Sequence, residues 1–325
     1  MTAVTAALRN TAVRRVGEVL ATLFGVAVCV FVMLRLLPGD QITASLGTEA
    51  AALTPGQRQA LEEYYGMNQP VPAQFFGWLG NVLTGNLGFV RRTGQSVMAM
   101  TLSALPTTAE LAVLSTMTGL LLAIPLALWS ASRPSALRDG VSQGVGLVAL
   151  SLPTFLLGSV LLAVASRYAG YNPNAQEFAP LWSNPLLNLQ QMLFPSLVLG
   201  FALTAPIMRT ARSALLEVSD LDFVRTARGK GVGAARIRRH HVLRGALVPI
   251  ATMTGIQFGY LLGGAVVVEQ IFSLPGLGRQ VLNGIQQKEY AVVQSTVLVV
   301  ALLFVLVNLG TDLLYRLIDP RVRDS

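Results

Sequence analysis

The chain has few of the side chains that carry metal or redox chemistry. Its 325 residues include one cysteine, Cys29, and two histidines, His240 and His241. A single cysteine excludes an internal disulfide and a thiolate metal cluster. The two histidines are adjacent, so on a helix they point in different directions, and no third ligand stands near them. We therefore expect no metal site and no disulfide framework.

Charge is also scarce. Only 12% of the residues are charged, whereas 53% are hydrophobic, and the mean hydropathy is +0.57. A soluble chain of this length needs more charge to cover its surface, so the composition indicates an integral membrane protein. The net charge of +8 fits either nucleic-acid binding or retention of Lys and Arg in cytoplasmic loops. In a chain this apolar, retention in cytoplasmic loops is the favoured explanation.

Six stretches meet the criterion of about 20 mainly apolar residues for one bilayer crossing. The expected spans are 16–37, 108–129, 141–166, 192–212, 246–272 and 291–315. Pro125 and Pro153 fall inside spans, where neighbouring helices can satisfy the freed carbonyls. No small-residue cleavage site follows the first span closely, so we expect an uncleaved helix there. The sequence predicts an all-α integral membrane protein with six transmembrane helices.

The polar segment 38–107 is too long to be a simple connection. Thr54 followed by Pro55 predicts the start of a short helix over 53–65. The aromatic-rich stretch 75–83 predicts a second helix. We expect a small helical subdomain on the outer face, between an N-terminal part (1–37) and a five-helix core (108–325).

Basic residues are distributed unevenly between the two sides that the spans define. Six crossings place both termini on one side, and that side carries most of the 24 Lys and Arg residues. Lys and Arg accumulate in cytoplasmic loops, so we expect this side, with both termini, to be cytoplasmic. Its basic residues are Arg9, Arg14, Arg15, Arg133, Arg138, Arg209, Arg212, Arg225, Arg228, Lys230, Arg236, Arg238, Arg239, Arg244, Arg316, Arg321 and Arg323.

The loop between the fourth and fifth spans, 213–245, combines helix-forming and helix-ending residues. Asp220 and Asp222 can cap a short helix and complement its dipole, and a second helix is expected to begin over 234–243. Such a loop would form a compact, rigid protrusion. The residues that end its first helix are Gly229, Gly231 and Gly233.

Three interpretations compete for this loop: an ordinary loop that follows the charge bias, a phosphate- or nucleic-acid-binding patch, and an element that docks a soluble partner. A phosphate site is disfavoured because "RGKGVG" lacks the spacing of a phosphate-binding loop. A nucleic-acid site is disfavoured because Phe223 stands alone, without the interleaved aromatics of a stacking platform. An ordinary charged loop and an element that docks a soluble partner therefore remain.

The loop resembles the EAA loop of membrane subunits of ABC importers, in the form found in the peptide-importer branch. "DFVRTARGKG" is followed at the expected distance by "HVLRGALVP". Arg225 stands at the usual glutamate and Gly231 at the loop's glycine. The loop departs from the branch at Gly229, where alanine is usual, and at Gly245, where asparagine is usual.

Further motifs extend the resemblance over nearly the whole chain. Together they are similar to the permease subunits of oligopeptide and dipeptide ABC importers, the OppB/DppB type. One departure is Ala291, which replaces a usual proline before the last span. The motifs are "LPGD", "YYGMNQPVPAQFFGWLGNVLTGNLG", "LPTTAELAV", "LSLPTFLLG", "VVEQIFSLPGLG" and "VNLGTDLLYRLIDPRVR".

The resemblance implies a type I ABC importer permease fold and a set of partners. These are a second homologous permease, one or two cytoplasmic ATPase subunits, an extracytoplasmic substrate-binding protein, a peptide substrate and membrane lipid, with no nucleic acid. ATP and Mg²⁺ would bind the ATPase subunits, so this chain would bind no cofactor and would not itself be an enzyme. The location would be the bacterial cytoplasmic membrane. The residues expected to contact the ATPase are Asp222, Phe223, Val224, Arg225, Thr226, Ala227, Arg228, Lys230 and Gly231.

Polar residues within the spans are candidates for the translocation path or its gate. They are Glu269, Asn308 and Asp312. An interfacial position for Glu269 and helix packing for the other two are the structural alternatives.

Three other functions remain to be weighed. The first alternative is an importer of the same type that carries nickel chelates or glutathione, as relatives of this permease branch do. An ion-coupled secondary transporter is disfavoured because no internal repeat is evident. A membrane enzyme is disfavoured because H-E-x-x-H, G-x-S-x-G and paired intramembrane aspartates are all missing from the sequence.

Overall fold

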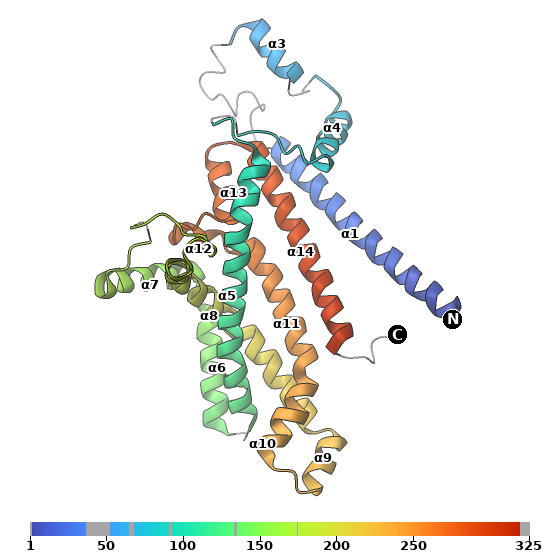
Figure 1. The fold of residues 1–325 in the computed structure, drawn as a ribbon, viewed down its shortest axis with the longest axis vertical. Helices are drawn as coiled ribbons and strands as arrows, with labels where there is room; N and C mark the ends of the chain where they lie inside the picture. The colour runs from blue at the N-terminus through green and yellow to red at the C-terminus, as the bar shows by residue number, and fades with distance from the viewer. Residues whose placement is uncertain are drawn as a thin grey trace. The chain divides into compact units, whose positions relative to one another are not determined.

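The computed structural model describes residues 2–36, 53–64, 68–90, 93–132, 135–173 and 175–318. The described part is helical, and its one β-type pairing is an isolated bridge between Phe89 and Ser96. The expected all-α fold is confirmed. The helices (Figure 1) are α1 (Thr2–Leu36), α3 (Pro55–Tyr64), α4 (Val71–Leu83), α5 (Val97–Ser132), α6 (Ala136–Ser151), α7 (Thr154–Ala169), α8 (Pro185–Ser219), α9 (Asp222–Gly229), α10 (Ala234–Arg236), a π-helical segment (Ile237–Val242), α11 (Leu243–Gly264), α12 (Val266–Ile271), α13 (Leu277–Gln286) and α14 (Tyr290–Ile318).

Among the described helices, four are long and apolar enough to cross a membrane: Val97–Ser132, Pro185–Ser219, Ala234–Gly263 and Tyr290–Thr311. The bent pair α6 and α7 adds a fifth if it forms one span, and α1 holds a shorter apolar stretch. Many large apolar side chains on these helices are exposed, for example Leu121, Leu147 and Val160. Extensive apolar exposure of this kind is typical of a surface that faces lipid.

The third expected span, 141–166, is wrong as one continuous helix. α6 ends at Ser151, Leu152 adopts an extended conformation, and Pro153 precedes α7, so that the two helices are bent by 94°. Proline restricts the preceding residue to extended backbone and cannot donate the helical hydrogen bond. Pro125 differs, because it lies inside the continuous helix α5.

The fifth expected span, 246–272, is displaced in the structure. α11 ends at Gly264, and the continuous helix that contains the apolar crossing begins earlier, at Ala234, where α10 and the π-helical segment lead into α11. Gly263 and Gly264 are adjacent, and glycine costs a helix about 1 kcal/mol relative to alanine. The helix therefore stops there, and α12 starts as a separate short helix.

Both helices expected after the first span are confirmed. Thr54 and Gln57 form a reciprocal cap at the start of α3: the Thr54 amide donates to Oε1 of Gln57 at 3.0 Å, and the Gln57 amide donates to Oγ1 of Thr54 at 3.4 Å. α4 begins at Val71, four residues before the expected start. Its Phe75 is buried against α1, with the ring 5.1 Å from that of Phe31.

The chain divides into two compact units. The first comprises Met1–Leu105 and Gln280–Val305, and in it Nε2 of Gln280 donates to the hydroxyls of Thr101 and Thr296 at 2.9 and 3.0 Å. The second comprises Pro106–Arg279 and Leu306–Ser325.

α8 forms the centre of the second unit. It packs against α6, α7, α11 and α12 and buries much of its length, including Met192, Ile207 and Met208. α5 approaches it very closely, because a Cβ on Gly200 would lie 2.5 Å from Cβ of Thr118. The residues of the candidate sites considered below lie in this unit.

Candidate functional site

α9 is an eight-residue helix that follows α8 and displays most of the predicted contact residues. Val224 is its fully buried residue, whereas Phe223 is 47% exposed. The basic side chains of Arg225, Arg228 and Lys230 are exposed as well. The Arg225 guanidinium lies 3.6 Å from the Asp222 carboxylate, but both groups are open to solvent, so this pair adds little stability.

The start of α9 differs from the prediction. Neither expected aspartate caps it with its side chain: Leu221 is the N-cap, Asp222 is the first helical residue and Asp220 belongs to the end of α8. An acidic first residue still complements the positive end of the helix dipole. The Thr226 hydroxyl donates within the helix, to the Asp222 carbonyl at 2.9 Å.

The end of α9 agrees with the prediction that glycines terminate it. Gly231 has a φ of +75°, which is a left-handed conformation suited to glycine. The amide of Val232 reaches back to the Ala227 carbonyl at 3.2 Å, and the Gly231 amide donates to the Arg228 carbonyl at 3.0 Å. These bonds close the last turn and satisfy carbonyls that the helix leaves free.

α9 packs against the π-helical segment (Ile237–Val242), which we call its base. The Phe223 ring lies 6.5 Å from the ring of His241, and Ile237 and Val242 are buried in the base. At the start of α11, a Cβ on Gly245 would lie 2.8 Å from Cγ1 of Val218 on α8. α9 is therefore mounted on tightly packed helices and presents a mixed apolar and basic outer surface.

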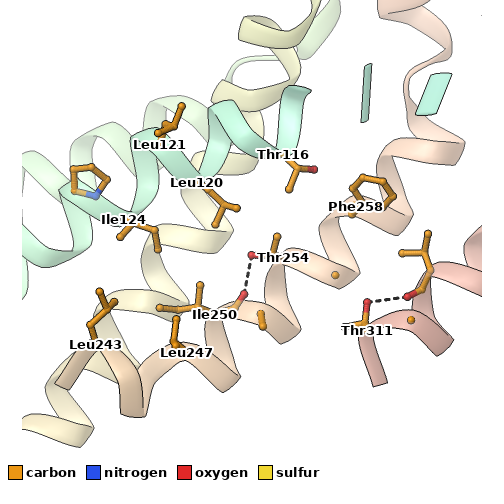
Figure 2. A pocket seen from close by; sticks show the side chains of 15 residues that line it. Thr116, Leu120, Leu121, Ile124, Leu243, Leu247, Ile250, Thr254, Phe258 and Thr311 are labelled. Atoms are coloured by element: carbon orange, nitrogen blue, oxygen red, sulfur yellow. Dashed lines mark hydrogen bonds between the residues drawn. The ribbon is translucent and has the colours of Figure 1, made fainter. Parts of the chain in front are cut away.

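A cavity of about 950 Å³ lies among α5, α11 and α14. Figure 2 shows the hydroxyls of Thr254 and Thr311 bonded within their own helices, to the carbonyls of Ile250 and Val307 at 2.8 Å each. These hydroxyls are engaged, so the cavity wall is largely apolar. Its lining residues are Thr116, Leu120, Leu121, Ile124, Pro125, Leu243, Leu247, Ile250, Ala251, Thr254, Gly255, Phe258, Val307, Gly310 and Thr311.

Glu269, predicted for the path or outer gate, is fully buried on α12. Its Oε1 accepts from the Thr108 hydroxyl at 2.7 Å, and its Oε2 accepts from the Arg279 amide at 2.9 Å. The same Thr108 oxygen accepts from the Leu277 amide at 2.8 Å. A Cβ on Gly276 would lie 2.3 Å from the carboxyl carbon, so the turn between α12 and α13 closes tightly over Glu269.

The two predicted residues of α14 are not brought to Glu269 by any described contact. Asn308 is half-buried and is not part of the cavity wall, although its neighbour Val307 is. Asp312 lies in helical backbone, but its side chain is outside the described residues. The placement of Asn308 and Asp312 on the path stays a prediction.

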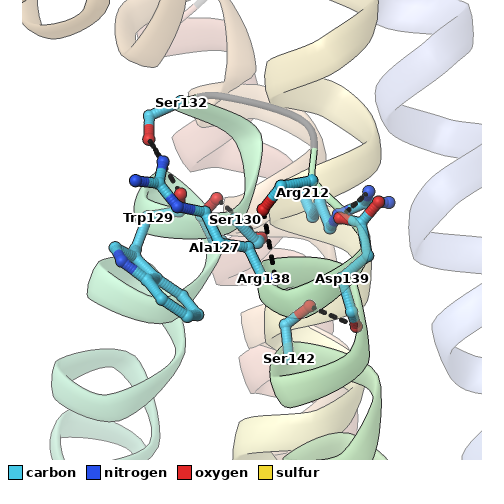
Figure 3. Close-up of polar contacts among 9 residues, drawn as sticks. Ala127, Trp129, Ser130, Ser132, Arg138, Asp139, Ser142 and Arg212 are labelled. Carbon is cyan, nitrogen blue, oxygen red and sulfur yellow. Dashed lines mark hydrogen bonds and ion pairs between the residues drawn. The ribbon is translucent and has the colours of Figure 1, made fainter.

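Sequence reasoning missed a polar cluster where α5, α6 and α8 meet (Figure 3). Nη2 of Arg212 on α8 lies 2.7 Å from Oδ1 of Asp139 on α6, and the two side chains are only 26% and 31% exposed. Arg212 was predicted only as part of the charge bias, and Asp139 was given no role. No local spacing rule connects residues so far apart in sequence.

Two family models match the sequence. The model of the binding-protein-dependent transport system inner membrane component matches residues 123–324, and the model of the N-terminal part of such membrane components matches residues 8–112.

Curated proteins match over nearly the whole chain. The glutathione transport system permease protein GsiC of Pectobacterium atrosepticum is 36% identical, over 97% of this chain and 99% of that protein. The di/tripeptide transport system permease protein DppB of Pseudomonas aeruginosa is 34% identical, over 95% and 97%. The oligopeptide transport system permease protein AppB of Bacillus subtilis is 33% identical, over 95% and 98%.

Among solved structures, a chain of the inward-facing MetNI methionine ABC transporter superposes with a TM-score of 0.55. The two chains are 20% identical, and the match covers 68% of this chain and 97% of the other. At this identity the likeness concerns the fold, and it agrees with the expected type of importer permease.

Proposed function

Since the chain belongs to the family of binding-protein-dependent transport system inner membrane components, we propose that it is the permease subunit of an ATP-driven importer of short peptides. The observation that carries the proposal is its identity of 33–36% with peptide and glutathione permeases over at least 95% of the chain. Glutathione is a second candidate substrate, because the glutathione permease from Pectobacterium is among these relatives.

In this proposal α9 docks on a cytoplasmic ATPase. Its exposed surface combines the apolar Phe223 with basic side chains, a combination suited to an acidic groove with an apolar floor. Val224 anchors the helix from below, so a push on α9 moves its base as well. ATP and Mg²⁺ bind the ATPase subunits, and both termini of this chain face the cytoplasm.

The transport assembly contains a second permease, one or two ATPase subunits and an extracytoplasmic binding protein that delivers the peptide. Glu269, Asn308 and Asp312 remain the proposed polar residues of the path or its outer gate. For Glu269, complete burial and the bonds to Thr108 and Arg279 support a part in shaping the gate turn rather than in forming an open wall.

Co-purification from detergent tests the docking of α9. The wild-type chain is expected to recover ATPase subunits and a second permease, identified by mass spectrometry. The Arg225→Glu, Gly231→Trp double variant reverses a charge and strains the left-handed turn, so it is expected to lose the ATPase. Gly229→Ala is the matched control, since a Cβ there meets nothing within 4 Å. A wild-type chain that purifies without any ATPase would refute the proposal.

Transport assays then separate the two substrate candidates. The purified assembly, with its binding protein, is placed in proteoliposomes loaded with ATP on the cytoplasmic side. Uptake of labelled di- and tripeptides is compared with uptake of labelled glutathione. Preferential uptake of peptides supports the main proposal, and uptake of glutathione alone selects the second candidate.

A further inference from the structure

The ion pair between Arg212 and Asp139 is a polar link between α8 and α6, two helices that also pack against each other. Arg212 lies two turns before the end of α8, and Asp139 lies in the first turn of α6. Nε of Arg212 is buried and has no hydrogen-bond partner among the described residues. Nη2 of the same guanidinium donates to the Asp139 carboxylate. Removing the carboxylate would leave a largely buried cation without an acceptor.

The start of α6 is fixed to the end of α5 by a second set of contacts (Figure 3). The Ser135 hydroxyl accepts from the Arg138 amide at 3.3 Å and caps α6. Nη1 of Arg138 donates to the Ser132 hydroxyl at 3.0 Å, and its guanidinium lies 5.5 Å from the ring centroid of Trp129. These contacts hold the start of α6 against the end of α5. The Arg212 ion pair links this corner to α8.

α8 runs without interruption from this ion pair to Ser219, shortly before α9 begins at Asp222. In the other direction, α6 leads through the 94° bend to α7, which packs on both α8 and α12. A Cβ on Gly158 of α7 would lie 3.5 Å from the Phe272 ring and 3.6 Å from Ile271, so α7 lies against the end of α12. α12 carries Glu269. A contiguous packed route therefore connects α9 with the turn that Glu269 holds.

We propose that the Arg212–Asp139 pair is a transmission joint, which makes α6 and α7 follow α8 when the ATPase displaces α9. The inference rests on the proposed function and adds two positioning residues that touch neither the ATPase nor the substrate. Without the joint, α6 and α7 follow α8 less closely, and ATP hydrolysis continues while rearranging the turn between α12 and α13 less effectively. A chain of packed contacts does not by itself demonstrate energetic coupling between α9 and the turn at Glu269. The coupling is therefore measured directly.

The experiment uses the whole importer in proteoliposomes and records peptide uptake and ATP hydrolysis in the same samples. Asp139→Asn and Arg212→Gln are each expected to lower the ratio of peptide transported to ATP hydrolysed about tenfold, a typical size for coupling between sites. The expected basal hydrolysis stays near the wild-type rate. Arg209→Gln is the matched control, because Arg209 is exposed on the same helix.

Two double variants distinguish a joint from a merely stabilising contact. The exchange Asp139→Arg with Arg212→Asp restores the attraction, and Asp139→Leu with Arg212→Met replaces it with apolar packing. Recovery of the uptake-to-hydrolysis ratio by either double variant supports the joint. Single variants with a wild-type ratio overturn it, as do single variants in which uptake, hydrolysis and the yield of assembled complex fall together. If the wild-type assembly moves no peptide, the proposed function itself fails, which is a separate result.

Discussion

At the scale of single residues, Glu269 shows how burial changes the meaning of a charged side chain. In the sequence Glu269 falls inside an expected span, and a carboxylate there suggests a functional site by default. Here the carboxylate accepts hydrogen bonds from the Thr108 hydroxyl and the Arg279 amide, and Gly276 packs directly against it. The hydrogen bonds offset part of the desolvation of the carboxyl group, and they fix the turn between α12 and α13.

Glu269→Ala is therefore expected to destabilise the purified protein by about 3 kcal/mol, because it leaves buried donors unsatisfied. The measurement is the change in unfolding free energy in detergent. Glu217→Ala is the control, since Glu217 is exposed on α8, and it should stay within about 0.5 kcal/mol of wild type. Equal losses in the two variants would contradict the anchoring of the turn.

At the scale of elements, the crossing of α5 and α8 depends on the absence of a side chain at Gly200. A Cβ there would lie 2.5 Å from Cβ of Thr118 and 2.8 Å from the Ser115 carbonyl oxygen. The second neighbour is backbone and cannot rotate away. Small residues allow membrane helices to approach closely and gain packing contacts, and Gly200 has this function in α8.

Gly200→Ala is expected to cost about 1–3 kcal/mol of unfolding free energy, the usual penalty for overpacking. Gly144→Ala on α6 is the matched control, because a Cβ there meets nothing within 4 Å and alanine favours helix. The control should equal or exceed the wild-type stability in the same detergent assay. A Gly200→Ala protein as stable as the control would show that the helices separate at little cost.

At the scale of the whole molecule, orientation follows from the charge bias rather than from packing. Ala235 and Trp182 are exposed and lie on opposite sides of the proposed topology. Ala235 belongs to the basic segment, and Trp182 precedes α8. Lys and Arg are retained on the cytoplasmic side, so Ala235 should face the cytoplasm and Trp182 the outside.

Single cysteines in a Cys29→Ser background test this orientation. Trp182→Cys is expected to react with an impermeant maleimide added to intact spheroplasts. Ala235→Cys is expected to react only after the membrane is permeabilised. Labelling in the reverse order would invert the topology and place α9 outside, beyond the reach of a cytoplasmic ATPase.

The amino-acid sequence by itself determined what depends on composition and short-range pattern. Scarce charge and long apolar runs indicated a helical membrane protein. The Thr54–Pro55 start of α3 and the glycine end of α9 were both predicted correctly, because local hydrogen bonds and backbone preferences decide them. Motif order along the chain indicated the family to which the sequence belongs.

Only the tertiary structure decided where helices bend and which distant residues meet. Pro125 remains within a continuous helix whereas Pro153 separates two, a difference that the sequence did not reveal. The Arg212–Asp139 pair and the Thr108–Glu269 bond join residues 73 and 161 positions apart. Such contacts depend on how the helices pack together, and no periodicity within one helix specifies which partner another helix will bring.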